Sequence, residues 1–134
     1  MIDLHCHLLP GVDDGPEDLA TSLAMARIAV ADGIRTTACT PHIYPGLFEN
    51  DSAGIAAGIA HLRRALGDEG IELRLVAGTD AHLTPELPGR LRAGTAPTLA
   101  GSRYFLLEPP HTVAPPRFAE SAFEFVAAGY VPVI

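Results

Sequence analysis

Residues 1–16, which read M-I-D-L-H-C-H-L-L-P-G-V-D-D-G-P, decide the fold and the chemistry of this chain. The apolar start I-x-L predicts a short buried strand, which leads into a turn rich in Pro, Gly and Asp. Side chains alternate faces along a strand, so His5 and His7 are expected on one face and Cys6 on the other. Two imidazoles on one side of a strand end can chelate one metal ion, and the acidic turn can fold back over that ion.

The bulk composition predicts a single folded domain without the charge pattern of a nucleic-acid-binding protein. A chain of 134 residues that is 48% hydrophobic suffices for a single domain, 1–134, with its own core. The formal net charge of −7 argues against binding to a nucleic-acid backbone or to an acidic membrane surface. No signal peptide is recognisable and no stretch approaches the ~20 apolar residues of a membrane span, so we expect a cytoplasmic protein. Cys6 and Cys39 are then expected to be buried free thiols.

Hydrophobic patterning alternates between strand and helix along the whole chain. This alternation predicts an α/β fold with a mostly parallel sheet. Strands are expected at residues 2–5, 34–40, 71–77, 103–107 and 130–134. Helices are expected after Pro16 with Glu17 and Asp18 in the first turn, from Asn50 or Asp51 to about 67–70, within 85–94, and from Pro115-Pro116 to Gly129. Their inward residues are expected to be Leu19, Leu23, Ala26 and Val30, then Ile55, Ile59, Leu62 and Leu66, and finally Phe118, Ala122, Phe123 and Val126.

Most of the histidines fall at or just after the ends of predicted strands. The residues in such positions are His5, His7, His42, His82 and His111, together with Asp80 and Glu108. His61 alone lies inside a predicted helix, where we expect a surface residue. The carboxyl ends of parallel strands converge on one rim, which is where α/β folds form their sites. A metal site at this rim is therefore predicted, with the roles of His82 and His111 left open.

A ligand set of imidazoles and carboxylates without thiolates suits zinc, manganese or iron. Carboxylates bridge ions, so a cluster is expected, and bridged ions ~3.5–4 Å apart activate bound water for hydrolysis of phosphate esters or amides. No Gly-rich loop opens a helix, and no G-x-S-x-G or C-x5-R motif supplies a nucleophile. The predicted nucleophile is therefore a metal-activated hydroxide.

These motifs resemble a known family. H-x-H-x-x-P-G-x-D-D-G-P at residues 5–16 and T-P-H at 40–42 are similar to the PHP (polymerase and histidinol phosphatase) superfamily. Within it, the chain resembles the bacterial manganese-dependent protein tyrosine phosphatases of capsular and exopolysaccharide biosynthesis. The stretches S-L-A-M-A-R-I-A-V-A-D-G-I (22–34), L-L-E-P-P-H (106–111) and A-A-G-Y-V-P-V-I (127–134) extend the match over the whole chain.

The resemblance implies a distorted TIM-like β/α barrel with two or three ions, manganese first and zinc or iron as alternatives. His5 and His7 would hold the first ion, and Asp14 and His42 another. Asp80 would bridge two ions, where the family usually has Glu, and Glu108 would bind the second of that pair. Asp14 and His42 would also handle protons during catalysis.

The resemblance also implies a longer chain. In the family a His-Pro-Glu-Arg segment and an Asp-x-His follow and complete the centre, and neither is present here. With about four βα units, the chain is expected to be an incomplete barrel, truncated at its C-terminus, whose terminal strand could self-associate.

The resulting hypothesis is hydrolysis of phosphotyrosine on a bacterial tyrosine kinase of polysaccharide biosynthesis. Two alternatives stay open. One is another PHP phosphoesterase, similar to histidinol phosphatase, and the other is a catalytically incomplete metal-binding half-domain.

Overall fold

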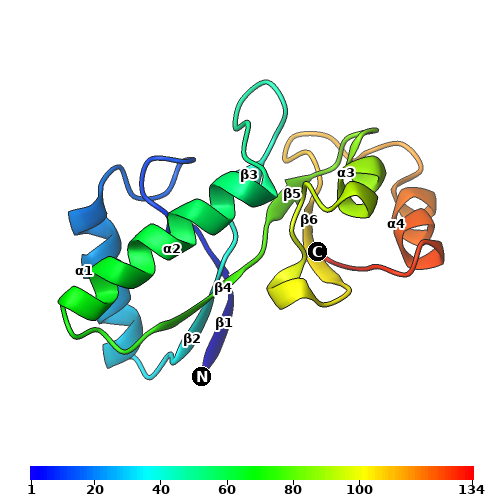
Figure 1. Cartoon of the computed structure of the whole chain (residues 1–134). Helices are drawn as coiled ribbons and strands as arrows, with labels where there is room; N and C mark the ends of the chain where they lie inside the picture. Colours follow the sequence, from blue (N-terminus) through cyan, green and yellow to red (C-terminus); the bar gives the residue numbers. More distant parts are fainter.

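The computed structural model describes all 134 residues and alternates strands with helices from end to end (Figure 1). The strands are β1 (Ile2–Cys6), β2 (Thr36–Cys39), β3 (His42–Ile43), β4 (Arg74–Ala77), β5 (Asp80–His82), β6 (Tyr104–Glu108) and β7 (Val131–Val133). The α-helices are α1 (Leu19–Ala31), α2 (Ser52–Asp68), α3 (Leu87–Ala93) and α4 (Phe118–Ala127), with a short 3₁₀ turn, η1, at Leu99–Gly101.

All strand pairings are parallel, which confirms the predicted α/β class. The strands form two sheets of order β1-β2-β4 and β3-β5-β6-β7. After Thr40-Pro41, β2 resumes as β3, and after Gly78-Thr79, β4 resumes as β5, so two strands pass from one sheet into the other. These short second strands were not predicted. They carry His42, Asp80 and His82, which were expected in loops beyond the strand ends.

Aspartates cap the two longest helices. Asp18 accepts a hydrogen bond from Thr21 N and Asp51 from Gly54 N, both at 2.8 Å. Each bond satisfies a backbone donor that the first helical turn leaves free. Asp18 is thus the N-cap of α1 and not, as predicted, part of its first turn, whereas Asp51 is one of the two caps predicted for α2.

One core cluster contains side chains from both sheets and from all four α-helices. The opening motif contributes Leu8 and Leu9, which are essentially inaccessible to solvent and fix the loop after His7 to the core. Leu9 packs beside Gly58 of α2, where a Cβ would come within 3.3 Å of the leucine Cδ1. The four residues predicted to face inward on α2 are all buried, and those of α1 are buried or packed against the core.

The expectation of a buried first strand is wrong. Ile2 is 65% and Leu4 53% exposed, because β1 is an outer strand and both side chains line an open cavity. A register shift against β2 between Asp3 and Cys6 also interrupts the strict alternation of side chains, so that Leu4 and His5 line the same hollow.

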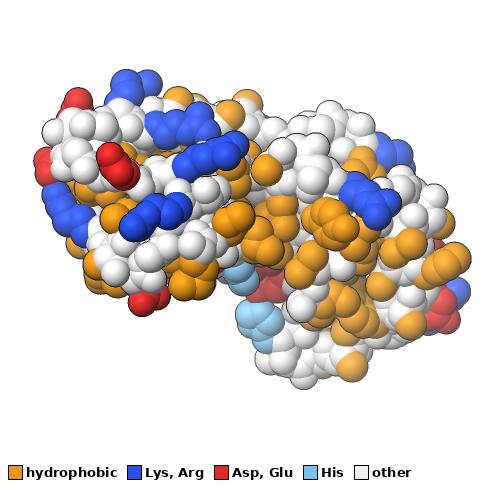
Figure 2. Space-filling model, turned by 90° about the horizontal axis from the view of Figure 1, so that it is seen from below, with side chains coloured by type: hydrophobic (Ala, Val, Ile, Leu, Met, Phe, Trp, Pro, Cys, Tyr) orange, Lys and Arg blue, Asp and Glu red, His pale blue; other side chains and the backbone are white.

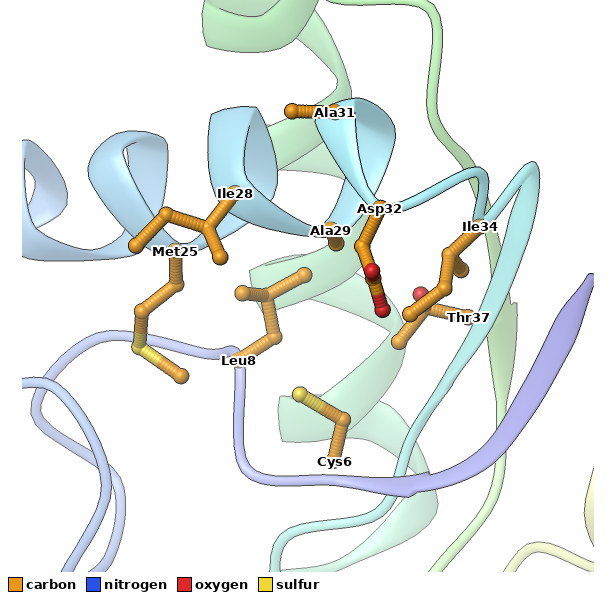
Figure 3. Close-up of a pocket in the computed structure, with 9 residues that line it drawn as sticks. All are labelled: Cys6, Leu8, Met25, Ile28, Ala29, Ala31, Asp32, Ile34 and Thr37. Carbon is orange, nitrogen blue, oxygen red and sulfur yellow. The ribbon is translucent and has the colours of Figure 1, made fainter.

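Cys6 lies on the opposite side of β1, as predicted, but it is only half-buried. It lines an open, mainly apolar cavity of about 640 Å³ between β1 and α1 (Figure 3). Cys39 is fully buried, and both thiols are free. Burial raises the pKa of Cys6 to about 11 and that of Cys39 to about 12, so neither is a thiolate at neutral pH.

The inward face of α4 differs from the prediction. Phe123 and Val126 are exposed, and Phe125, which was not predicted, is the buried residue. At about 100° per residue, Phe123 lies about 140° around the helix from Phe118, so both cannot face the core. Phe125, seven residues after Phe118, returns to the same face and packs edge-on against Phe105 at 5.1 Å between ring centroids.

None of the helices combines the length and the apolar character that a transmembrane span requires.

Candidate metal centre

The two histidines of the opening motif project to the same place. Their Nε2 atoms lie 3.3 Å apart, which confirms that His5 and His7 share a face. His7 Nδ1 donates a hydrogen bond of 2.8 Å to Asp13 Oδ2. Asp13 is buried and also accepts from the backbone N–H groups of Gly15 and His42. The acidic turn therefore folds back onto the strand end and holds the Nδ1 edge of the His7 ring.

The six residues predicted as ligands come together in three groups. In each group one side-chain ligand atom per residue lies within 4.8 Å of the others. The groups are His5-His7-Asp80, His7-Asp14-His42 and His42-Asp80-Glu108. Each pair of groups shares one residue, which makes a triangle of adjoining sites. Figure 2 shows histidine and acidic side chains gathered in a hollow near the middle of the face it displays.

Asp80 is shared by two of the groups although its side chain is shorter than the glutamate of the family pattern. It is buried at the start of β5, and its Oδ2 lies 3.3 Å from His5 Nε2 and 3.7 Å from His42 Nδ1. Because the residue stands on a strand and not in a loop, its carboxylate is carried directly between the two histidines. At this position the shorter side chain of aspartate is therefore long enough to reach both groups.

The electrostatics of these groups favour a bound cation. His42 Nδ1 is buried and makes no hydrogen bond, yet it lies 3.1 Å from Glu108 Oε2. Burial, and then the nearby charge of Glu108, raise the pKa of Asp80. A divalent ion among His42, Asp80 and Glu108 would supply the missing partner of the imidazole and neutralise the two carboxylates. The donor set therefore fits a hard or borderline divalent metal.

His82 and His111 surround Glu108 and belong to none of the three groups. Their ring nitrogens lie 3.4 Å from Glu108 Oε2 and 2.5 Å from Oε1, respectively. His82 is also stacked against Tyr44, with centroids 3.8 Å apart. These contacts orient the Glu108 carboxylate from two sides, which gives both histidines a supporting place at the site.

The family model described as "Capsular polysaccharide synthesis, CpsB/CapC" matches residues 1–134. This chain belongs to the CpsB/CapC family. The match confirms the predicted resemblance and extends over every residue that forms the three groups.

Relatives of known activity are similar along much of the chain. Tyrosine-protein phosphatase YwqE of Bacillus subtilis is 38% identical over 135 residues, which cover 100% of this chain and 53% of the relative. Tyrosine-protein phosphatase CpsB of Streptococcus pneumoniae is 32% identical over 108 residues, 81% of this chain and 44% of the relative. A structure solved in work on YwqE and CpsB as metal-dependent tyrosine phosphatases superposes with a TM-score of 0.93 at 38% identity, covering 100% of this chain and 54% of that one.

This CpsB/CapC chain thus spans about half the length of the relatives it matches. The shared half contains the parallel sheets and all three candidate ligand groups. The sheets show no closure into a barrel, since β1 and β7 are outer strands.

Asp13 is the site residue that sequence reasoning did not assign. It is adjacent to the predicted ligand Asp14 in the D-D pair, but its side chain is buried behind His7, whereas that of Asp14 is 65% exposed. The two adjacent aspartates were the sequence signal for this role, because a histidine ligand commonly donates its second ring N–H to a carboxylate. The hydrogen bonds from His7, Gly15 and His42 outweigh the effect of burial and lower the pKa of Asp13.

Gly15 in the same turn is required by close packing. A Cβ at this position would lie 2.7 Å from the carbonyl oxygen of His7 and 2.9 Å from its Cβ. Any larger residue would push the turn away from His7 and would separate Asp13 from the imidazole. The glycine of D-D-G-P is therefore part of what builds the site.

Proposed function

We propose that this chain carries the metal centre of a phosphatase that hydrolyses phosphotyrosine on proteins, with a tyrosine kinase of polysaccharide biosynthesis as the substrate. The observation that supports this most directly is the triangle of three ligand groups that share His7, His42 and Asp80. Family membership and the similarity to YwqE and CpsB supply the reaction class. We further propose that the two parallel sheets are part of a TIM-like barrel and that manganese is the preferred metal, with zinc or iron as alternatives.

Individual residues of the chain have distinct roles in such a centre. Asp13 holds His7 by Nδ1, which leaves Nε2 directed towards His5 and the ligand group. His42 lies between Asp14 on its Nε2 side, at 3.5 Å, and Glu108 on its Nδ1 side, at 3.1 Å. Bound divalent ions would lower the pKa of water towards about 7 and neutralise charge on the phosphate.

Asp14 is the residue best placed to move a proton between the centre and solvent. Its side chain is mostly exposed, yet Oδ1 lies 3.3 Å from His7 Nδ1 and 3.5 Å from His42 Nε2. A proton accepted there can pass to bulk water without crossing the protein. His42 is partly buried and belongs to two of the groups, so it would hold the metal beside Asp14.

The test combines metal content with turnover. After reconstitution with Mn²⁺, elemental analysis is expected to find at least two ions per chain, and hydrolysis of a phosphotyrosine peptide is expected to be weak beside that of a full-length relative. The His5→Ala/His7→Ala variant should lose both. His61→Ala is the matched control, because His61 is exposed on α2 far from the groups in sequence, and it should retain both. A double variant that keeps its metal would contradict the proposal.

Substrate class is tested with the same preparation. A preference for phosphotyrosine peptide over histidinol phosphate supports the proposed function, whereas the opposite preference assigns the chain to the other phosphoesterase class. The length of the match supports one further candidate, a catalytically incomplete metal-binding half, since the chain spans about half of its relatives. Metal uptake without turnover on either substrate would establish that alternative.

A further inference from the structure

A small pocket opens directly beside the ligand groups. Its volume is about 310 Å³. Its lining includes the candidate metal ligands Asp14, His42 and Glu108 and the apolar side chains Leu47, Phe48 and Pro110. Metal-binding and apolar side chains therefore border the same space. Such a lining suits a ligand that carries both an anionic group and an apolar group.

Leu47 and Phe48, which form the apolar wall of the pocket, belong to a tight turn after β3 that projects from the body of the molecule in Figure 1. Tyr44 and Phe48 pair at its base, with Tyr44 N donating to Phe48 O at 3.0 Å and Phe48 N to Tyr44 O at 2.8 Å. Gly46 at its tip has a positive φ of 87°, which glycine adopts without strain. The turn is therefore held in place by its own backbone.

The two aromatic rings at the base of this turn fix its position on the metal groups. Phe48 is stacked on His42 with centroids 5.4 Å apart and planes 9° apart. Tyr44 is stacked on His82 with planes 7° apart. The wall of the pocket and the ligand His42 are thus one packed unit, so a molecule bound at the metal groups meets this wall at a fixed place.

Leu47 completes the wall in an unusual way. It follows the glycine of the turn and is 63% exposed, although it is a large hydrophobic side chain beside a polar centre. A ligand ring in the pocket would cover it. The volume lies at the low end of ligand pockets, which is room for a single ring and not for a nucleotide.

We propose that this pocket receives the aryl group of an aryl phosphate monoester, with Leu47 and Phe48 as the residues that select a ring over an alkyl chain. The inference rests on the proposed function, because the phosphate must be held at the metal groups. It goes further by assigning the part of the chain that distinguishes phosphotyrosine from phosphoserine.

Binding of non-hydrolysable phosphonates to the Mn²⁺-loaded chain tests the assignment without turnover. Calorimetry should show phenylphosphonate binding about tenfold more tightly than methylphosphonate, as expected for burial of part of a ring. Leu47→Ser should reduce this preference about threefold or more, and the conservative Leu47→Met should preserve it. Ile28→Ser is the matched control, because Ile28 is also exposed but lies on α1 beside the other cavity.

The outcomes distinguish a failure of the proposed function from a failure of the pocket assignment. Failure to take up Mn²⁺ would defeat the proposed function and this inference together. Metal uptake with equal affinity for the two phosphonates, or a preference unchanged in Leu47→Ser, would overturn the pocket assignment alone. Metal content is measured for every variant, so that loss of the ring preference is attributed to the wall only where the ions are retained.

Discussion

At the scale of single residues, Asp13 fixes the orientation of the His7 ring. Its carboxylate accepts three hydrogen bonds, from His7 Nδ1, Gly15 N and His42 N. Asp13→Asn places an amide among three donors, so at least one contact becomes unfavourable. We expect the affinity for Mn²⁺ to fall about 10–100-fold, the usual effect of losing such a support.

Calorimetric titration with Mn²⁺ measures this effect, with circular dichroism to check the fold. Asp68→Asn is the control, because Asp68 is an exposed residue at the end of α2 and should bind as the wild type does. Equal affinities of Asp13→Asn and the wild type would show that His7 needs no support from Asp13.

His7 also predicts a pH dependence of metal binding. The hydrogen bond to Asp13, set against a smaller opposing effect of burial, raises the pKa of His7 above 6.5. The metal-free protein therefore keeps this proton to a higher pH than a free histidine, and a bound ion must displace it. Affinity for Mn²⁺ should weaken as pH falls through that raised pKa, by about tenfold per unit for one displaced proton.

Titrations from pH 8 to pH 6 in buffers of different ionisation enthalpy would show both the loss of affinity and the proton released. The raised pKa of His7 also makes the folding stability of the metal-free chain depend on pH. A raised histidine pKa stabilises the fold below 6.5, and this contribution is lost as pH rises through the folded value. An affinity for Mn²⁺ independent of pH over this range would be incompatible with ligation by His7.

The residues that gather in the three groups were largely predictable, because these candidate ligands lie at or just after the ends of strands predicted from the sequence. Sequence patterns reveal which residues share a rim, but not which oxygen faces which nitrogen. The burial of Asp13 and the support of Glu108 by His82 and His111 depend on such contacts. The shared position of Asp80 likewise depends on its being carried by a strand, which no local pattern indicated.

At the scale of elements, the passage of two strands from one sheet to the other positions the site. Gly78 makes this passage possible between β4 and β5. A Cβ there would lie 2.8 Å from Leu99 Cδ2 and 2.9 Å from the Cγ2 of the buried Thr40. Gly78→Ala is therefore expected to destabilise the protein by about 1–3 kcal/mol.

Denaturant unfolding measures this change, and Gly67→Ala provides the matched control. Gly67 lies in α2 with nothing within 4 Å of a new Cβ, so alanine should be neutral or stabilise by up to about 1 kcal/mol. Equal stability of the two variants would show that the strand passage tolerates a side chain.

The elements themselves were predicted best where one face is buried along a regular period, as in α2. They were predicted least well where tertiary structure overrides the local pattern. β1 looks buried in sequence but lies at an edge, and the α4 pattern admits two faces of which packing on Phe105 selects one. The division of two strands between the sheets, after Thr40-Pro41 and after Gly78-Thr79, depends on tertiary packing, which a hydrophobic run does not encode.

At the scale of the whole molecule, the two outer strands have unpaired backbone edges that lie beside exposed apolar side chains. β1 and β7 each have one unpaired edge, and a cavity of about 460 Å³ extends between them. Ile2, Leu4 and Val133 line it from the two strands. Open strand edges beside apolar surface are templates for pairing with another chain. We therefore propose that the isolated 134-residue chain self-associates through this region.

Val133→Lys tests this proposal, because a charge on an edge strand opposes pairing and Val133 is partly exposed on β7. Sedimentation velocity over a range of concentrations should show the wild type associating and the variant remaining monomeric. Ile28→Lys adds the same charge to an exposed position on α1 that does not line the cavity between the outer strands, and should associate as the wild type does. A wild type that is monomeric at all concentrations and unfolds cooperatively would refute association through these edges. The isolated fold would then be stable with both strand edges unpaired.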